Sequence, residues 1–292
     1  MKKERIFAYI SVLIASDFLL IFSRSFFDLS SLVTASVHSL LVFIMLIISA
    51  IYFKRLLKLN LMLLAVNVTY ILTAFLYGTD QFKQWFDQRI FVGQFGGSIL
   101  LKMIAAGLVA LLLITVFGGF EKSFMLMGDL KVKADRMGWL GIGHQKISWG
   151  KLAVISAILI SMGTFLGTVV TVTGFTFVRN IDVLLSLMPF VLILALGNSL
   201  FEGILYRNTI IASLTTVLDK NDVVLLGAIF FGVAHYFGAP GGPLGVVMSG
   251  VLGWYLCRSM IETKGLFASW LIHFLQDVVI FSAVILLGGF GI

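Results

Sequence analysis

Long apolar runs are the feature that most restricts how this chain can fold. Nine runs reach or approach the roughly 20 residues that a helix needs to cross a bilayer, at 6–23, 32–53, 59–77, 97–118, 151–173, 183–214, 222–237, 244–262 and 266–287. Backbone groups in lipid must be hydrogen-bonded within the chain, and these runs are continuous, unlike the alternating strands of a membrane barrel. With 60% hydrophobic and 12% charged residues, the sequence predicts an all-α, polytopic membrane helical bundle of about nine transmembrane helices.

The basic residues indicate which side of the membrane each loop faces. With a cytoplasmic N-terminus and alternating sides, four basic residues fall outside, Arg24, Lys83, Arg89 and Arg179, and Lys102 lies within a run. The other sixteen fall inside, namely Lys2, Lys3, Arg5, Lys54, Arg55, Lys58, Lys122, Lys131, Lys133, Arg136, Lys146, Lys151, Arg207, Lys220, Arg258 and Lys264. This is the asymmetry of the positive-inside rule. The net charge of +7 therefore follows from topology and predicts no nucleic-acid partner.

A hydrophilic segment divides the chain. Residues 121–150 are expected to form a cytoplasmic or interfacial linker, with Trp139 and Trp149 at the headgroup level, between an N-terminal four-helix region (1–120) and a C-terminal bundle (151–292). The first run contains Asp17 and lacks a clear cleavage site, so we interpret it as a retained helix and not a secretory signal. The single cysteine excludes an internal disulfide and a CxxC motif.

Ionisable residues inside a membrane are costly and are therefore candidates for function. Seven of those in the runs are singled out: Asp17, His38, Lys102, Glu202, His235, His273 and Asp277. Phe231 and His235 are four residues apart, as are His273 and Asp277, so each pair shares a helix face. Helical rise places the last four ionisable residues at depths that allow one shared cavity in the cytoplasmic half of the bilayer.

Carboxylates and imidazoles gathered in an apolar setting suit hydrolysis. A desolvated glutamate can take a proton from a water molecule that a histidine positions. The same four residues, Glu202, His235, His273 and Asp277, could instead hold zinc or another divalent metal, although the sequence has no HExxH motif.

Structural roles account better for the remaining candidates. An interhelical hydrogen bond suits a histidine such as His38. Asp17 and Lys102 are expected to reach the interface from helix ends or to form a mutual ion pair. Phe231 is expected to pack beside the site and exclude water.

Three motifs, in order on successive runs, carry a resemblance. They are E-x-x-x-x-R (Glu202, Arg207), F-x-x-x-H (Phe231, His235) and H-x-x-x-N/D (His273, Asp277). Over about residues 150–287 the chain resembles the CPBP family (CAAX protease and bacteriocin-processing, or Abi) of intramembrane proteases.

The resemblance implies a role for each residue. Glu202 with His235 would activate the attacking water, His273 with Asp277 would stabilise the oxyanion, and Arg207 would fix the glutamate helix. Family members have been described both as metal-dependent and as glutamate-dependent enzymes, so both routes stay open.

The chain departs from the family pattern in two places. Gly203 stands where a second glutamate is usual. An ionised Asp277 could not donate to an oxyanion, so it would orient His273, keep it charged or ligate a metal.

These observations favour an intramembrane endopeptidase acting on a peptide or membrane-tethered polypeptide. Its site would open to the cytoplasm, with the glycine-rich stretch 237–245 at the entry, in a bacterial plasma membrane. One alternative is a catalytically weak family member that acts as a membrane scaffold, regulator or bacteriocin-immunity-type protein. A proton-relaying transporter is a third reading, but it predicts inverted repeats that the sequence lacks. No oligomeric state follows from the sequence.

Overall fold

The computed structural model describes residues 2–27, 29–86, 90–144, 146–170, 176, 180–238 and 241–287. The helices of the first half are α1 (Lys2–Ala15), α2 (Phe18–Phe26), α3 (Ser31–Tyr52), α4 (Leu57–Gly78), α5 (Asp80–Trp85) and α6 (Phe91–Phe117). Those of the second half are α7 (Trp149–Phe165), α9 (Ile181–Glu202), α10 (Thr209–Leu214), α11 (Lys220–Val233), α12 (Gly242–Thr263) and α13 (Phe267–Leu286). Short 3-10 turns at Lys54–Leu56 (η1) and Gly138–Leu140 (η2) and π-helical turns at Leu166–Val170 (η3) and Gly203–Asn208 (η5) complete the order.

The described residues confirm a polytopic helical bundle. Seven helical segments are long and apolar enough to cross a membrane, or eight if the bent pair of α1 and α2 counts as one span. The expected count of about nine is close, and the difference lies in α11, whose 14 residues are fewer than a span needs. Of the residues used above, Arg89, Arg179, Ala239 and Pro240 lie outside the described residues.

Local chemistry sets several helix ends. The Ser30 side chain accepts a hydrogen bond from Val33 N at the start of α3, and Asp219 caps α11 by accepting from Asn221 N and Asp222 N. Gly118, with φ of 78°, ends α6 in the left-handed region that glycine adopts without strain. Each of these residues satisfies backbone groups that a helix end leaves free.

The first predicted run is a broken helix. α1 ends at Ala15, α2 begins at Phe18, and the two axes are bent by 48°. The Ser16 hydroxyl donates to Leu13 O and accepts from Phe18 N, so it satisfies backbone groups at the break. Asp17 therefore sits at a kink within the predicted span.

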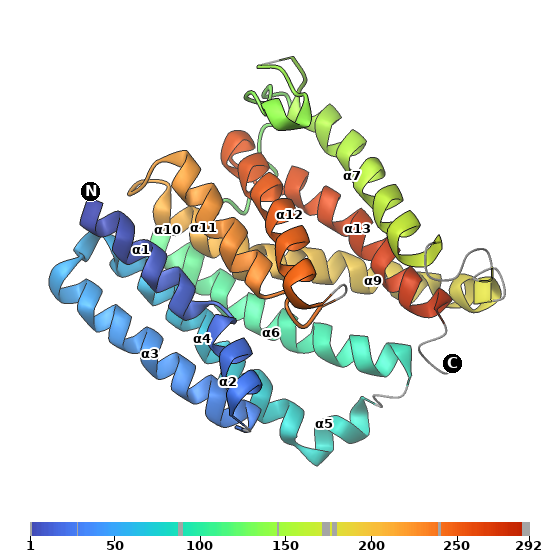
Figure 1. The fold of residues 1–292 in the computed structure, drawn as a ribbon, viewed down its shortest axis with the longest axis horizontal. Coiled ribbons are helices and arrows are strands. Elements are labelled where there is room, and N and C mark those ends of the chain that lie inside the picture. The colour runs from blue at the N-terminus through green and yellow to red at the C-terminus, as the bar shows by residue number, and fades with distance from the viewer. Residues whose placement is uncertain are drawn as a thin grey trace.

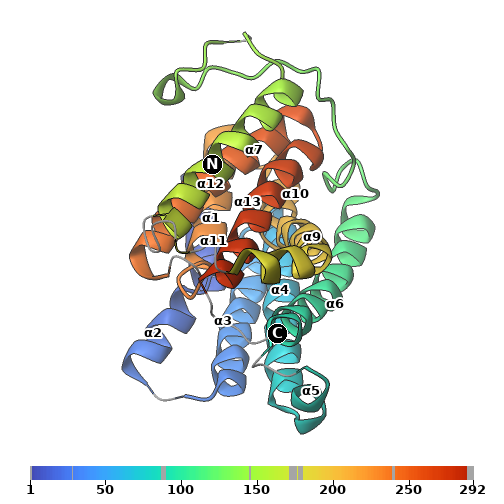
Figure 2. The ribbon, with the colours of Figure 1, turned by 90° about the vertical axis from the view of Figure 1, so that its right-hand side faces the viewer.

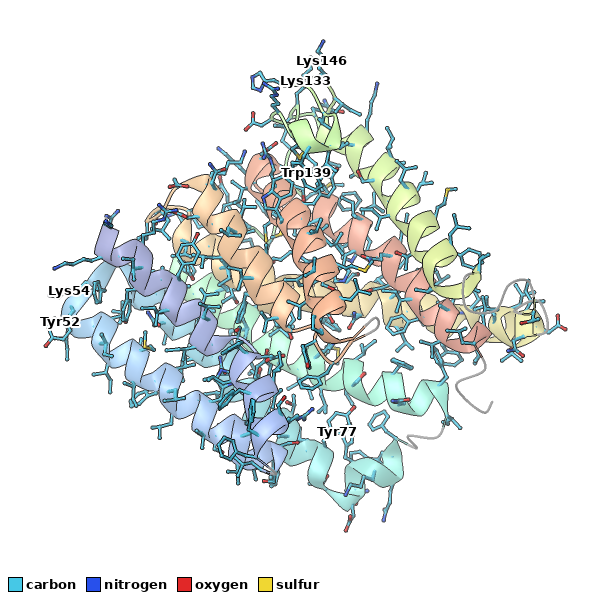
Figure 3. The ribbon with its side chains drawn as sticks, in the orientation of Figure 1. Tyr52, Lys54, Tyr77, Lys133, Trp139 and Lys146 are labelled. Atoms are coloured by element: carbon cyan, nitrogen blue, oxygen red, sulfur yellow. The ribbon has the colours of Figure 1, made fainter. Side chains whose placement is uncertain are left out.

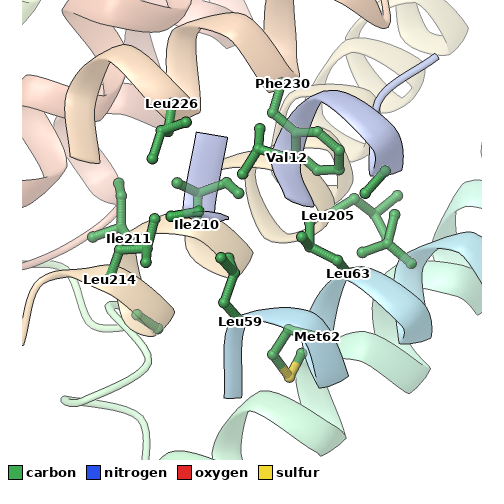
Figure 4. Close-up of a cluster of buried hydrophobic side chains, with 14 of the residues drawn as sticks. Val12, Leu59, Met62, Leu63, Leu205, Ile210, Ile211, Leu214, Leu226 and Phe230 are labelled. Carbon is green, nitrogen blue, oxygen red and sulfur yellow. The ribbon is translucent and has the colours of Figure 1, made fainter. Parts of the chain in front are cut away.

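N-terminal helices pack directly on the helix that carries Glu202. α6 contacts both α4 and α9, and α9 contacts α13, so α6 and α9 join the two halves of the bundle (Figure 1). Figure 4 shows one apolar cluster drawn from both halves, with Val12 of α1 and Leu63 of α4 facing Leu205 of η5 and Phe230 of α11. The position of η5 thus depends on residues far earlier in the chain.

The segment between α6 and α7 is fastened to α12 by one carboxylate. Glu262 Oε2 accepts from Asp135 N at 3.0 Å and from Trp149 Nε1 at 2.7 Å. Its Oε1 accepts from Lys220 Nζ at 2.5 Å and Arg258 Nε at 2.8 Å. The Lys220 ammonium also donates to Asp135 Oδ2 at 2.8 Å. This hydrogen bond holds the pKa of the Asp135 carboxyl below its ordinary value.

The two tryptophans of this segment differ from each other. Trp139, labelled in Figure 3, is 63% exposed, which is compatible with the headgroup level, and its ring lies 5.3 Å from that of Trp254 on α12. Trp149 is fully buried and donates its indole hydrogen to Glu262, so the expectation of a headgroup position for it was wrong. A buried carboxylate acceptor holds an indole N–H more strongly than interfacial water does.

Replacing Glu262 by glutamine should loosen this segment. The neutral amide leaves Lys220 and Arg258 without their shared anion, and charge-assisted hydrogen bonds contribute roughly 1.5–3 kcal/mol. We expect a lower unfolding free energy and faster tryptic cleavage after Lys131 and Lys133, measured by mass spectrometry of timed digests. The exposed Glu121→Gln, in the same segment, is the control. Equal digestion rates for the two variants would count against the anchor.

Candidate active site

Glu202 lies at a break in the helix that carries it. α9 ends at Glu202, the next six residues form the π-helical turn η5, and the helix resumes as α10, all within one span of 34 residues. π-helical turns inside α-helices are frequent at functional sites. The Glu202 side chain is buried.

The two oxygens of Glu202 have different surroundings. Oε1 accepts from Lys102 Nζ of α6 at 2.5 Å. Oε2 is buried and has no hydrogen-bond partner among the described residues. It lies 3.6 Å from His235 Nε2 and 3.6 Å from His273 Nε2. The oxygen left free by Lys102 is thus the one that faces both imidazoles.

His235 lies in the turn that follows α11. The predicted run 222–237 continues past the helix, which ends at Val233, and His235 N donates to Gly232 O. His235 Nδ1 lies 2.7 Å from Phe231 O. A carbonyl oxygen can only accept, so Nδ1 carries the hydrogen and Nε2 of the neutral ring presents a lone pair toward Glu202.

His273 on α13 has the opposite arrangement. Both terminal nitrogens of Arg207 lie 3.4 Å from His273 Nδ1. A guanidinium can only donate, so Nδ1 accepts and the hydrogen of the neutral ring is on Nε2. That N–H faces Glu202 Oε2 at 3.6 Å and Asp277 Oδ1 at 3.5 Å. The two histidines therefore present an acceptor and a donor to the same carboxylate.

Asp277 lies one turn after His273 and is held from a second helix. Asn198 Nδ2 of α9 donates to Asp277 Oδ2 at 3.0 Å. Both side chains are buried. Asp277 is therefore fixed by one oxygen while the other faces the His273 N–H.

Arg207 reaches the site because of the π-helical turn. In an α-helix residues five apart point about 140° away from each other, whereas the i to i+5 pairing of a π turn stacks them on one side. Arg207 is fully buried, donates to Ser199 O at 3.3 Å and lies over the Phe231 ring at 5.1 Å. A side chain at Gly203 would meet the Arg207 guanidinium at 3.0 Å, so the glycine leaves room for it.

Phe231 contacts three members of the site. Its ring lies 4.4 Å from the His235 ring and 5.5 Å from the His273 ring, measured between centroids, in addition to Arg207. The side chain is fully buried. The six residues of the three motifs are therefore neighbours in space, as their order in the sequence predicted.

Lys102 is the site residue that sequence reasoning missed. It was expected at an interface or paired with Asp17, but in the described structure it binds Glu202 and, at 2.6 Å, Asn198 Oδ1. The position of Lys102 inside an apolar run indicated a functional role, but nothing in the sequence indicated that its partner is Glu202. His38 makes the expected interhelical bond, with Nε2 2.6 Å from Ile14 O.

A zinc site would need donor atoms that converge on one position. The donor types suit zinc, yet no three His, Cys, Asp or Glu side chains in the described part of the chain are grouped so as to hold a metal ion. One oxygen of Glu202 is also already bound by an ammonium. This arrangement does not favour a metal centre, and chelation in the cleavage experiment below tests the metal predicted at these four positions.

One part of the chain is similar to a known protein family. Residues 184–279 match a family model described as Type II CAAX prenyl endopeptidase Rce1-like. This match confirms the resemblance to the CPBP intramembrane proteases. No curated protein and no solved structure matches the chain.

The family match and the site coincide. All six motif residues and Asn198 fall within 184–279, whereas Lys102 lies outside the matched segment. Residues 184–279 are therefore similar to a CAAX-type endopeptidase family, and the apolar helices are those of an integral, multi-pass membrane protein. The ammonium on Glu202 comes from the part of the chain that the family model does not cover.

Proposed function

We propose that the chain is an intramembrane endopeptidase in which Glu202 and His235 activate water and His273 stabilises the oxyanion. The substrate is a peptide or membrane-tethered polypeptide, in a bacterial plasma membrane. The observation that carries the proposal is the approach of Glu202 Oε2 to two imidazole nitrogens, one accepting and one donating, at 3.6 Å each.

The activating step follows from two acceptors that face each other. Neither Glu202 Oε2 nor His235 Nε2 carries a hydrogen, so a water molecule between them can donate one hydrogen bond to each. As the water oxygen bonds to the scissile carbonyl carbon, the carbonyl π electrons move to its oxygen and Glu202 Oε2 takes the water proton. Lys102 keeps Oε1 occupied and so directs Oε2 to this task.

The His273 side of the site then stabilises the negative charge that develops on the carbonyl oxygen. The His273 N–H, fixed by Arg207 on the opposite ring nitrogen, is placed to donate to the oxyanion. Asp277 acts as an acceptor that orients this N–H. When the tetrahedral intermediate collapses, the C–N bond breaks and Glu202 returns its proton to the leaving nitrogen, giving a carboxyl terminus and an amine.

The opposite roles of the histidines predict unequal responses to glutamine. A glutamine amide can place an N–H near the position of His273 Nε2, so His273→Gln should recover about ten-fold of the 10²–10³-fold loss expected for His273→Ala. His235 Nε2 accepts a hydrogen bond from the water, and an amide oxygen is a much weaker base than an imidazole nitrogen, so His235→Gln should recover clearly less over His235→Ala. The measurement is kcat/KM for the four purified variants. Equal rescue at both positions would contradict the assignment of roles.

A broad cleavage screen tests the function itself. Purified protein in detergent is offered a library of apolar peptides, some ending in a prenylated cysteine sequence because the matched family is described by prenyl substrates. We expect cleavage that survives chelation. Loss on chelation and recovery with zinc would overturn the glutamate route, and no cleavage of any peptide would overturn the peptidase.

The Lys102 ion pair also supports a second candidate. One oxygen of Glu202 is already bound by an ammonium at 2.5 Å, and Gly203 supplies no second carboxylate. A weakly active member could serve as a membrane scaffold, regulator or immunity-type protein. Such a protein would keep its cellular phenotype when Glu202 is replaced, provided the variant folds.

A further inference from the structure

A large cavity lies beside the site, among helices that the family match does not cover. Its volume is about 920 Å³, and its walls come from α2, α3, α4, α5 and α6, with Leu205 and Tyr206 of η5 at the inner end. Figure 2 shows these N-terminal helices below the C-terminal bundle. Tyr77, labelled in Figure 3, lines the cavity near the turn into α5.

The cavity reaches the candidate active site at two points. Lys102 lines it, and the same ammonium binds Glu202 Oε1 at 2.5 Å. The Lys102 side chain is 35% exposed, so its charge is reachable. Tyr206 also lines the cavity, and its ring meets the edge of Phe231 at 6.1 Å between centroids. A molecule in the cavity would therefore touch groups that contact Glu202 and the histidine cluster.

The lining is both apolar and rich in hydrogen-bonding groups. The walls contain leucine and alanine side chains together with five hydroxyl-bearing residues, Thr34, Thr69, Thr73, Ser98 and Tyr70. Thr34 is buried, and its hydroxyl has no hydrogen-bond partner among the described residues. The walls therefore offer apolar side chains together with polar groups from three helices.

The charges favour one kind of occupant. Arg24, Lys83 and Lys102 line the cavity against the single carboxylate of Asp17. Acyl chains carry no hydrogen-bonding groups along their length, whereas an extended polypeptide carries a carbonyl and an N–H at every residue. The hydroxyls of Thr69, Thr73 and Ser98 already donate to backbone carbonyls of their own helices, so their oxygens are left to accept from the N–H groups of an occupant. The cations of this wall can donate to its carbonyl oxygens.

The bend between α1 and α2 bounds this space on one side. α2 follows the 48° break and has no buried residue of its own, although Leu20 and Arg24 line the cavity. On this side the wall is a single helix, and the apolar side chains of Phe18, Phe22 and Phe26 on α2 are exposed. A membrane-embedded segment has a short path to the cavity here.

We propose that this cavity is the substrate chamber of the peptidase and that it holds an extended, apolar polypeptide segment whose carbonyl groups accept from Lys102 and whose N–H groups donate to the hydroxyl oxygens. This inference rests on the proposed function. To the proposed function it adds the chemical class of the substrate segment, and it assigns the selection of that segment to the N-terminal helices. It also moves the expected entry from the 237–245 stretch to the N-terminal helices.

Photo-crosslinking tests the chamber without requiring turnover. The probe is an apolar peptide of about 20 residues with a benzophenone side chain at its centre, bound to full-length Glu202→Gln protein. We expect crosslinks to α3, α4 or α6 at cavity-lining residues. Ala74→Trp, which fills the cavity, should abolish them and, in the active protein, raise KM by about ten-fold or more with a smaller effect on kcat.

Matched variants separate blockage from misfolding. Val68→Trp places the same side chain on α4 at a site that is 49% exposed, and we expect it to leave crosslinking and KM unchanged. Ala74→Leu, a milder filler, should give an intermediate KM if the tryptophan variant does not fold. Crosslinks only at other surfaces, or equal KM values for Ala74→Leu, Val68→Trp and wild type, would overturn the chamber.

Two further outcomes are distinguishable. If a photoreactive phospholipid labels the cavity and the peptide does not, the cavity is a lipid site and the proposal fails. If the peptide crosslinks in the cavity but wild-type protein cleaves nothing, the peptidase fails while the polypeptide site stands.

Discussion

Glutamine in place of Glu202 is expected to lower kcat/KM by about 10³-fold, within the 10²–10⁴-fold range of general-base catalysis. The amide has nearly the same size but cannot take a proton from water. With its oxygen toward Lys102, its NH₂ would donate to the lone pair of His235 Nε2, now 3.6 Å from Oε2, and would displace the water that both acceptors hold. Two contributions to the activation of water are thus lost together.

Steady-state kinetics of purified wild type and Glu202→Gln measure this effect. KM should change little, because Glu202 acts on water and not on the bound segment. Thermal unfolding of the two proteins checks that both are folded, and Glu121→Gln, exposed and distant in sequence, is the control for charge loss. Activity of Glu202→Gln within about ten-fold of wild type would remove Glu202 from the mechanism.

The second large effect is a coupling between Lys102 and Glu202 in stability and turnover. Removing one partner of a buried ion pair leaves the other charge uncompensated, which costs about 3–5 kcal/mol when both are buried. Since Lys102 is 35% exposed and Glu202 only 7%, solvent screens part of this, and we expect about 1–2 kcal/mol for Lys102→Met. The double variant Lys102→Met/Glu202→Gln should be more stable than the sum of the single losses predicts.

Denaturant unfolding of the four proteins gives the coupling energy directly. Lys102→Met should also lower kcat by about 10²-fold with KM less affected, and Lys102→Arg should recover part of it, because the guanidinium can still hold Oε1. The control cycle is Asp80 with Lys83, a surface pair at 3.8 Å with 93% and 57% exposed side chains, for which we expect less than about 0.5 kcal/mol. Additive losses at 102 and 202 would contradict the account.

The sequence was sufficient for the parts of the site that obey helical spacing. His273 and Asp277 share a face of α13 because they are four residues apart, and the three motifs lie on elements that pack together. The helical membrane class followed from apolar runs whose length the bilayer fixes. Both inferences use rules that act within a single helix.

Features that depend on tertiary packing could not be predicted. Lys102 and Glu202 are a hundred residues apart and meet because α6 lies against α9. The π-helical turn that brings Arg207 beside His273 has no spacing signal of its own, and α-helical geometry would have pointed Arg207 away. Trp149 looked interfacial by type, but a carboxylate on α12, over a hundred residues later, determines its burial. The misses at Lys102 and Trp149 each reflect a partner supplied by another helix.

The most direct measurement is cleavage of a membrane peptide in heavy-oxygen water, with the products weighed by mass spectrometry. The account predicts that wild-type protein yields two fragments, that the new carboxyl terminus carries one oxygen from the solvent, and that Glu202→Gln yields neither under the same conditions. Fragments formed equally by both proteins, or no fragments from folded wild-type protein with any peptide of the library, would contradict hydrolysis by water activated at Glu202.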